Sequence, residues 1–235
     1  MKNKIKESFS KIAGSYDSAA SMHEQIIDKL LASLDGDYHN ILDIGCGTGT
    51  MAAKLAKKFS KAEIVGLDLA PGMVEQAKTK ANSPKIKFLS GDAEALPFLD
   101  KFFDLVVSTS SLQWMECKQV FKEVRRVLKP GGAFCFTTFG SATLAKAKEA
   151  GLAINSFLSK DELLAGLAPY FQIKKFDSCL LEQEFVDLFA LRKYLKTIGA
   201  AVSSSKKQSG LRKIKTDKIK DSFEVFVFSA FVPGD

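Results

Sequence analysis

The sequence predicts an α/β fold in which helices cover both faces of a largely parallel sheet. Three observations support this fold class. Short apolar segments with the pattern of buried strands alternate with segments of helical periodicity over much of the chain. The length of 235 residues suits one domain. The composition, 46% hydrophobic and 26% charged, suits a globular protein with a full-sized core.

Five strands and three helices are expected in the first part of the chain. The strands are 40–45, 63–68, 86–90, 103–108 and 132–138. The helices fill the intervals at 50–59, 71–81 and 117–128. Pro71 stands at a helix start, and the turn Pro130-Gly131-Gly132 is expected to end the third helix before a strand.

The C-terminal part contains another helix and two more strands. Ser159 and Glu162 have the spacing of a capping box, so a short helix is expected to begin there. Strand candidates follow at 171–181 and 223–232. The segment between them, 182–220, is mostly helical by pattern and includes a polar run at 203–210. We therefore expect an insertion between the last two strands.

The net charge of +7 is concentrated in this insertion. Residues 182–220 hold ten Lys/Arg and four Asp/Glu, whereas all other residues together hold 24 basic and 23 acidic side chains. The stretch has three interpretations: a solvated helical face, a nucleic-acid surface, or a docking surface for an acidic protein. Residues 206–220 lack the interleaved aromatics typical of nucleic-acid binding, so no nucleic-acid partner is expected.

The composition also argues against membrane, secreted and metal-binding classes. The longest apolar runs, such as 105–107 and 134–136, are too short to cross a bilayer, and the N-terminus has no signal-peptide pattern. The four cysteines lack CxxC spacing and there are only two histidines, so no metal site is expected. Cysteines inside strand segments suit free thiols of a reducing compartment, so a cytoplasmic location is expected.

The sharpest local feature is the segment ILDIGCGTG, residues 41–49. A buried strand runs into glycines at 45, 47 and 49 and then into a helix, and glycine lets a ligand approach the backbone closely. A G-x-G-x-x-G loop would suit a pyrophosphate. Here the spacing is G-x-G-x-G, and Asp43 precedes it. Because a carboxylate repels phosphate and attracts an amino group, the loop predicts a nucleoside carrying an amino acid; a turn with only packing duties is the alternative.

Two further acidic residues end the next two strands. Asp68 can accept both ribose hydroxyls, and Asp92 can accept the adenine amino group. Strand-end Asp residues often only cap helices. Three of them at successive strand ends are more informative, because ligands in open α/β sheets bind at that edge. Met73 has two interpretations, contact with the adenine or helix packing.

The series LDIGCGTG, GLDLAPGM, GDAEALPF, FDLVVS and RRVLKPGG, in order within residues 40–138, resembles the class I S-adenosylmethionine-dependent methyltransferases. The resemblance implies a Rossmann-like, seven-stranded sheet with a reversed last strand and the helical insertion before it, in a single domain of residues 1–235. It implies S-adenosylmethionine as the cofactor. The candidate cofactor residues are Asp43, Gly45, Cys46, Gly47, Asp68, Leu69, Met73, Asp92, Ala93 and Ser108.

Further stretches resemble one family more closely. FSKIAGSYDSAA (9–20), STSSLQW (108–114), FGSATL (139–144) and LRKYLKTIGA (191–200) are similar to the malonyl-acyl-carrier-protein O-methyltransferases of biotin synthesis. The chain departs from that pattern at Met115, where the family commonly has Cys, and at His23 or a near neighbour, where it has Gln. The tryptophan usual after the Thr-Leu pair is missing. The resemblance implies methyl transfer to the free carboxylate of a malonyl thioester.

The chemistry suits the residues available. A carboxylate is already nucleophilic, so methyl transfer needs positioning and desolvation rather than a general base. The substrate carboxylate still needs a cation, and Arg192 is the candidate, with a surface salt bridge as the alternative. Tyr16, in a segment 1–35 expected to form a lid, is the second catalytic candidate, with packing as the alternative. Gln113 and Trp114 are candidates for substrate binding, with core packing as the alternative for Trp114.

The resemblance also bears on the basic insertion and on the alternatives. Acyl carrier proteins are acidic, so the resemblance favours docking of such a carrier on 182–220. One alternative function is methyl transfer to another small acceptor, such as a quinone precursor or a free acid, against which the Arg192 segment argues. Another is a non-catalytic adaptor that binds the cofactor, against which the intact glycine loop argues.

Overall fold

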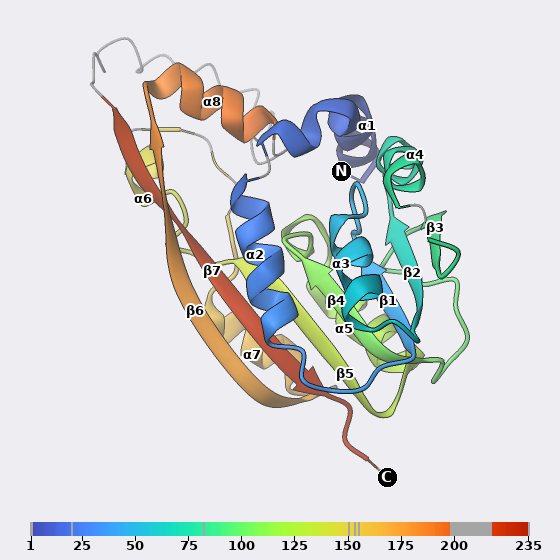
Figure 1. Cartoon of the computed structure of the whole chain (residues 1–235). Coiled ribbons are helices and arrows are strands. Elements are labelled where there is room, and N and C mark those ends of the chain that lie inside the picture. Colours follow the sequence, from blue (N-terminus) through green and yellow to red (C-terminus); the bar gives the residue numbers. More distant parts are fainter. Residues whose placement is uncertain are drawn as a thin grey trace.

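The computed structural model describes residues 2–19, 21–81, 83–149, 151–152, 154, 156–197 and 218–234. Seven strands form one sheet in the order β3-β2-β1-β4-β5-β7-β6 (Figure 1). The strands are β1 Asn40–Ile44, β2 Glu63–Asp68, β3 Ile86–Ser90, β4 Phe103–Thr109, β5 Leu128–Phe139, β6 Gln172–Phe185 and β7 Ile219–Phe231. The helices are α1 Lys2–Ile12, η1 Ala13–Ala19, α2 Ser21–Ala32, α3 Thr50–Lys58, α4 Pro71–Lys80, η2 Leu112–Trp114, α5 Cys117–Val127, α6 Ala145–Glu149, α7 Lys160–Leu167 and α8 Leu188–Thr197.

The strand directions confirm the predicted topology. β1 pairs in parallel with β2 and β4, β2 with β3, and β4 with β5. β7 is antiparallel to both of its neighbours, β5 and β6. The sheet is therefore Rossmann-like and seven-stranded, with the last strand reversed.

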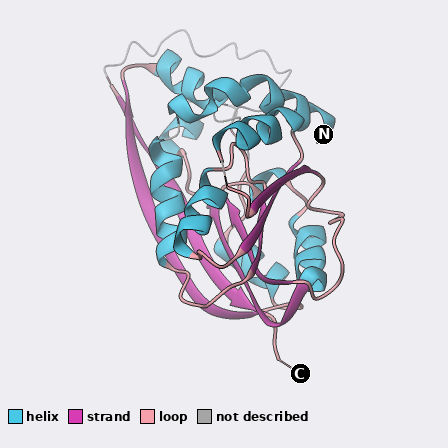
Figure 2. Ribbon diagram, turned by 45° about the vertical axis from the view of Figure 1, so that its right-hand side comes forward, coloured by secondary structure: helices cyan, strands magenta, loops and turns pink. Residues whose placement is uncertain are grey.

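Two apolar clusters lie on opposite faces of the sheet, because successive side chains of a strand point to opposite sides. One cluster contains Leu42 and Val106 together with residues of α5 and α7. The other contains Ile41 and Leu105 together with residues of α2, α3 and α4. Helices consequently lie on both sides of the twisted sheet (Figure 2). The central parallel strands β1 and β4 are buried on both faces, which explains their nearly continuous apolar sequences.

The start of β5 differs from the expectation. The strand begins at Leu128, so Pro130-Gly131-Gly132 lies inside it and does not separate it from α5. Leu128 pairs with Phe103 and Ala133 pairs with Leu105, so the residues between them bulge out of the ladder. Gly131 takes a φ of 74°, which suits glycine at such a bulge.

The last two strands form a longer hairpin than expected. β6 continues to Phe185 and β7 begins at Ile219. Ion pairs between the strands lie along this extension, with 2.6 Å between Lys218 and Glu184 and 2.8 Å between Lys220 and Glu182. Of the expected insertion 182–220, both ends thus belong to strands and α8 lies between them, while residues 198–217, including the polar run 203–210, lie outside the described residues.

The helices α7, α1, α2 and α8 complete the fold around the sheet. Ser159 and Glu162 form the predicted capping box at the start of α7. Within the N-terminal segment, α1 packs against α4, whereas α2 contributes the fully buried Ile26 and Leu30 to the core. Helices α1 and α8 both lie beyond the carboxyl ends of the parallel strands (Figure 1). No helix in the described part of the chain is long and apolar enough to cross a membrane.

Candidate active site

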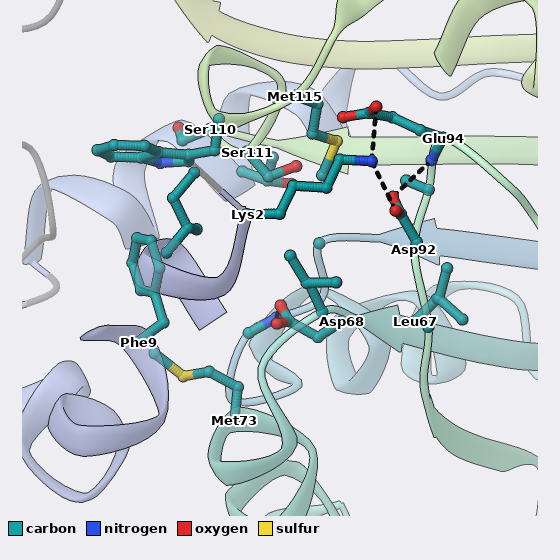
Figure 3. Close-up of a pocket in the computed structure, with 18 of the residues that line it drawn as sticks. Lys2, Phe9, Leu67, Asp68, Met73, Asp92, Glu94, Ser110, Ser111 and Met115 are labelled. Atoms are coloured by element: carbon teal, nitrogen blue, oxygen red, sulfur yellow. Dashed lines mark hydrogen bonds and ion pairs between the residues drawn. The ribbon is translucent and has the colours of Figure 1, made fainter. Parts of the chain in front are cut away.

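Two cavities lie at the carboxyl edge of the parallel strands. The first is lined by the ends of β2, β3 and β4 and by side chains of α1 and η2 (Figure 3). The second lies beside the glycine loop, α2 and the start of α3. Tyr16, Gly45, Gly47 and Thr109 line both cavities. The two cavities therefore meet at these residues.

The glycine loop needs glycine for two different reasons. Gly45 has a φ of 68°, and a Cβ added there would lie 2.4 Å from the Cβ of Ser111. Gly47 has a φ of 53°, and a Cβ added there would meet nothing within 4 Å. Packing thus explains Gly45, whereas Gly47 keeps the backbone open toward the cavities.

Asp43 carries a buried carboxylate beside this loop. The residue is 1% exposed, and neither carboxylate oxygen has a hydrogen-bond partner of good geometry in the described part of the chain; the Ala52 N–H is near enough only to lower its pKa, less than burial raises it. Burial, with the nearby charge of Asp68, raises the pKa of Asp43 to about 8. A buried carboxylate without a partner is costly, and a bound cation removes that cost. The amino group of S-adenosylmethionine is such a cation, so this residue fits the cofactor.

Asp68 faces the first cavity from the end of β2. Its Oδ1 accepts a hydrogen bond from the Ala70 N–H at 2.8 Å, and its Oδ2 accepts one from the Gly47 N–H at 2.9 Å. Burial raises the pKa of this carboxyl. Each oxygen has a second lone pair, so Asp68 can still accept ribose hydroxyls.

Asp92 forms an ion pair with Lys2, at the N-terminal end of the chain. Its Oδ2 lies 2.6 Å from Lys2 Nζ, which also lies 2.6 Å from Glu94 Oε2 (Figure 3). The hydrogen bond to Asp92, followed by that to Glu94, raises the pKa of Lys2. The Asp92 Oδ1 accepts from the Glu94 N–H at 2.9 Å. An adenine amino group would therefore compete with Lys2 for Asp92.

Tyr16 lines both cavities, and its neighbours Asp17 and His23 line the second. The Tyr16 hydroxyl lies 3.3 Å from His23 Nε2. Burial, then the charge of Asp68, raises the pKa of Tyr16, and burial lowers the pKa of His23 to about 4, so both are neutral at pH 7. Asp17 accepts a hydrogen bond from Thr48 Oγ1 at 2.7 Å and forms an ion pair with Lys80. These two contacts attach η1 to the glycine loop and to α4.

The other predicted residues divide into two groups. Leu69, Met73, Ala93 and Trp114 line the first cavity, and Cys46 lines the second. Ser108, Gln113 and Arg192 line neither cavity. Ser108 is fully buried and bonds Ser111 at 2.6 Å, and the Gln113 side chain donates to the Ser110 carbonyl at 2.6 Å. Arg192 is half-buried on α8, which packs against η1.

Sequence reasoning missed several lining residues. Lys2 and Phe9 reach the first cavity from α1, and Phe9 packs edge-on against Trp114 with ring centroids 5.5 Å apart. Thr109 and Ser110, directly after the core of β4, have buried hydroxyls without a partner. The only sequence signal for them is a short polar run at a strand end. The described residues contain no group of three His, Cys, Asp or Glu placed to hold a metal ion.

Comparison with known proteins gives one consistent family. Residues 41–132 match the family described as a methyltransferase domain. The chain is 31% identical to malonyl-[acyl-carrier protein] O-methyltransferase 1 of Ilyobacter polytropus, over 94% of this chain and 88% of that protein. It is also 31% identical to the biotin biosynthesis bifunctional protein BioHC of Saccharophagus degradans, over 96% of this chain and 43% of that protein. A Methanosarcina mazei SAM-dependent methyltransferase structure has the same fold, with a TM-score of 0.62, 23% identity and coverage of 88% and 98%.

Proposed function

Because the chain belongs to the S-adenosylmethionine-dependent malonyl-[acyl-carrier protein] O-methyltransferases, we propose that it methylates the free carboxylate of a malonyl thioester carried by acyl carrier protein, as a step of biotin synthesis. The single observation that supports binding of the cofactor is the environment of Asp43. Its buried, unpartnered carboxylate beside an open glycine loop suits a ligand with an amino group better than one with a phosphate.

Each end of the cofactor has its own residues in this proposal. Asp43, with the backbone of Gly45, Cys46 and Gly47, binds the amino-acid end. The nucleoside end is bound by Asp68 and Asp92 and enclosed by Leu69, Met73 and Ala93. Ser108 contributes indirectly: its hydroxyl is hydrogen-bonded to the hydroxyl of Ser111, which lines the first cavity. When bound, S-adenosylmethionine supplies an electrophilic methyl group on a sulfonium.

The acceptor side needs a dry, positively charged pocket and no general base. Tyr16 lines both cavities and, with α1 and η1 of the segment 1–35 acting as a lid while α2 belongs to the core, keeps water away from the reacting atoms. Trp114, packed against Phe9, forms a wall of the acceptor entrance. Arg192 binds the malonyl carboxylate from α8, and Gln113 supports the Ser110 backbone at the entrance.

The basic insertion 182–220 is the docking surface for acyl carrier protein in this proposal. Its net excess of six positive charges complements an acidic carrier, and α8, which lies within the insertion, packs against η1, whose Tyr16 lines both cavities. All four cysteines are free thiols, which supports a cytoplasmic location for a single-domain enzyme of residues 1–235.

Mass spectrometry of methyl transfer tests the proposed reaction. The protein with S-adenosylmethionine should convert malonyl-acyl carrier protein, and more slowly malonyl-coenzyme A, to their methyl esters. Acetyl-acyl carrier protein, which lacks the free carboxylate, is the matched control and should stay unchanged. Methylation of a quinone precursor or a free acid in place of both malonyl thioesters would contradict the proposal.

Salt dependence tests the carrier docking separately. Exposed charges are screened within about 10 Å at 0.1 M salt. The kcat/KM for the carrier-bound substrate should therefore fall steeply with salt, and that for the coenzyme A thioester should fall less. Charge reversal at Lys206, Lys207 and Arg212, which lie outside the described residues, should act in the same unequal way. Equal effects on both substrates would reduce the insertion to a solvated face.

A further inference from the structure

The end of β4 carries four hydroxyl side chains in a row, and only two of them have a structural partner. Ser108 and Ser111 bond each other at 2.6 Å, and Ser111 donates to the Ile44 carbonyl at 3.1 Å. Thr109 Oγ1 and Ser110 Oγ are equally shielded from solvent but have no hydrogen-bond partner in the described part of the chain. A buried hydroxyl without a partner is destabilising, so these two call for another explanation.

The backbone of Ser110 adds an independent observation. Its φ is 51°, in the left-handed region that is unfavourable for a residue with a Cβ. The conformation is fixed on both sides. The Ser110 N–H donates to the carbonyl and to Oγ1 of Thr137 at 3.0 and 3.2 Å, and the Ser110 carbonyl accepts from the Gln113 side chain at 2.6 Å. Strain that neighbouring residues enforce is typical of functional sites.

The two hydroxyl-bearing residues lie close to the place where the first and second cavities meet. Ser110 lines the first cavity, on the side opposite Asp68 and Met73 (Figure 3). Thr109 lines both cavities. In the proposed function the first cavity binds the nucleoside end and the second binds the amino-acid end of S-adenosylmethionine. The sulfonium joins these two ends, so Thr109 and Ser110 border the place of methyl transfer.

We propose that the hydroxyls of Thr109 and Ser110 bind the carboxylate of the acceptor and orient it for methyl transfer; this rests on the proposed function. In the proposed function Arg192 supplies the positive charge beside the carboxylate, and the two hydroxyl donors hold one of its oxygens, so the other oxygen keeps its lone pair for attack. That oxygen forms the new C–O bond while the S–C bond breaks and its electron pair goes to sulfur. No proton is transferred. Gln113 is then a positioning residue that acts through Ser110.

Isosteric and strain-relieving variants test this assignment. Thr109→Val and Ser110→Ala remove the hydroxyls, and Ser110→Gly removes both the hydroxyl and the left-handed strain. Thr109→Ser keeps the hydroxyl. Ser229→Ala is the matched control, because Ser229 is as buried as Ser110, at 8% exposure for each, and bonds only Cys135 among the described side chains. The readouts are kcat and KM for malonyl-coenzyme A, the calorimetric Kd for S-adenosylmethionine, and Tm.

The expected pattern separates positioning from folding. Each hydroxyl loss should lower kcat/KM by about 10- to 100-fold, the effect of a hydrogen bond to a charged group. The cofactor Kd should stay unchanged, and Thr109→Ser and Ser229→Ala should behave as wild type. Ser110→Gly should raise Tm and yet lose as much activity as Ser110→Ala.

Two results would overturn the assignment, and a third would overturn the proposed function instead. Wild-type kcat/KM in Thr109→Val and Ser110→Ala would show that the hydroxyls do not hold the acceptor. An equal loss of cofactor affinity would assign them to the cofactor. If wild-type protein binds S-adenosylmethionine but forms no methyl ester of malonyl-acyl carrier protein or malonyl-coenzyme A, the proposed function itself is wrong.

Discussion

Replacing Asp43 with asparagine separates two properties of this carboxylate, its effect on the fold and its attraction for the cofactor. Asparagine has nearly the same shape and stays neutral at every pH. In the wild-type protein burial raises the pKa of Asp43 from 3.8 to about 8. Between these two values the folded chain keeps a proton that the unfolded chain releases. The contribution of this group to stability is therefore fully present below pH 3.8 and is lost as the pH rises toward 8.

The size of the effect follows from this interval. At about 1.4 kcal/mol per pH unit, keeping the carboxyl protonated from its ordinary pKa of 3.8 up to pH 7 destabilises the cofactor-free fold by roughly 4 kcal/mol. Asp43→Asn should remove most of this loss near pH 7 and change little near pH 4. The same substitution removes the charged partner of the cofactor's amino group. Affinity for S-adenosylmethionine should fall by about 10- to 100-fold.

Two measurements check this prediction. Urea unfolding of the cofactor-free proteins at both ends of the pH window should show a stability gain for Asp43→Asn only at the higher pH. Calorimetric titration should show weaker cofactor binding, and wild-type affinity should rise with pH up to about 8, because a cation prefers the ionised carboxylate. A variant with unchanged stability near pH 7 and unchanged cofactor affinity would refute the reasoning.

Three further predictions concern the lid, the loop and the acceptor. Lys2→Met frees its two paired carboxylates and should lower the cofactor Kd severalfold in calorimetry, with exposed Lys4→Met as the control; weaker binding would mean that the lysine supports the cofactor. Gly45→Ala should lower Tm more than Gly47→Ala in thermal unfolding, because only the former clashes, and equal shifts would contradict the packing argument. Arg192→Ala should lower kcat/KM on a malonyl thioester by about 2–4 kcal/mol of transition-state stabilisation, and Arg192→Lys should also be poor, with the cofactor Kd unchanged. Wild-type turnover of Arg192→Ala would make the arginine a surface residue.

The parallel half of the sheet was predictable because of how it is buried. The strands β1, β2 and β4 have a strand neighbour on both sides, so each sequence is a short, largely apolar run with clear ends. The predicted bounds of β1 to β4 agree with the structure within one residue. β6 was predicted too short for the opposite reason. It is an edge strand in which exposed and half-buried residues mostly alternate, and Glu182 and Glu184 stand near its end. Such a segment has no apolar run to mark where it ends.

The site divides in a similar way. Asp43, Asp68 and Asp92 could be placed together because parallel strands bring their carboxyl ends to one edge. The contact of Lys2 with Asp92 joins residues separated by 90 positions, and a lysine in an exposed helix has no pattern that reveals a partner. The run from Ser108 to Ser111 contains both partnered and unpartnered hydroxyls, and the sequence alone makes no distinction among them.

The long hairpin of β6 and β7 has a consequence for how such a protein can diversify. β5 pairs with β7 only from Phe231 back to Val225, so residues 219–224 of β7 form their ladder with β6 alone and extend toward α8. No strand pairing in the described residues connects this overhang to β1, β2 or β4. Insertions, deletions and substitutions at its tip can therefore accumulate while the inherited nucleoside-binding half stays intact. For protein engineering, the overhang is the part to exchange between relatives when a new acceptor is wanted.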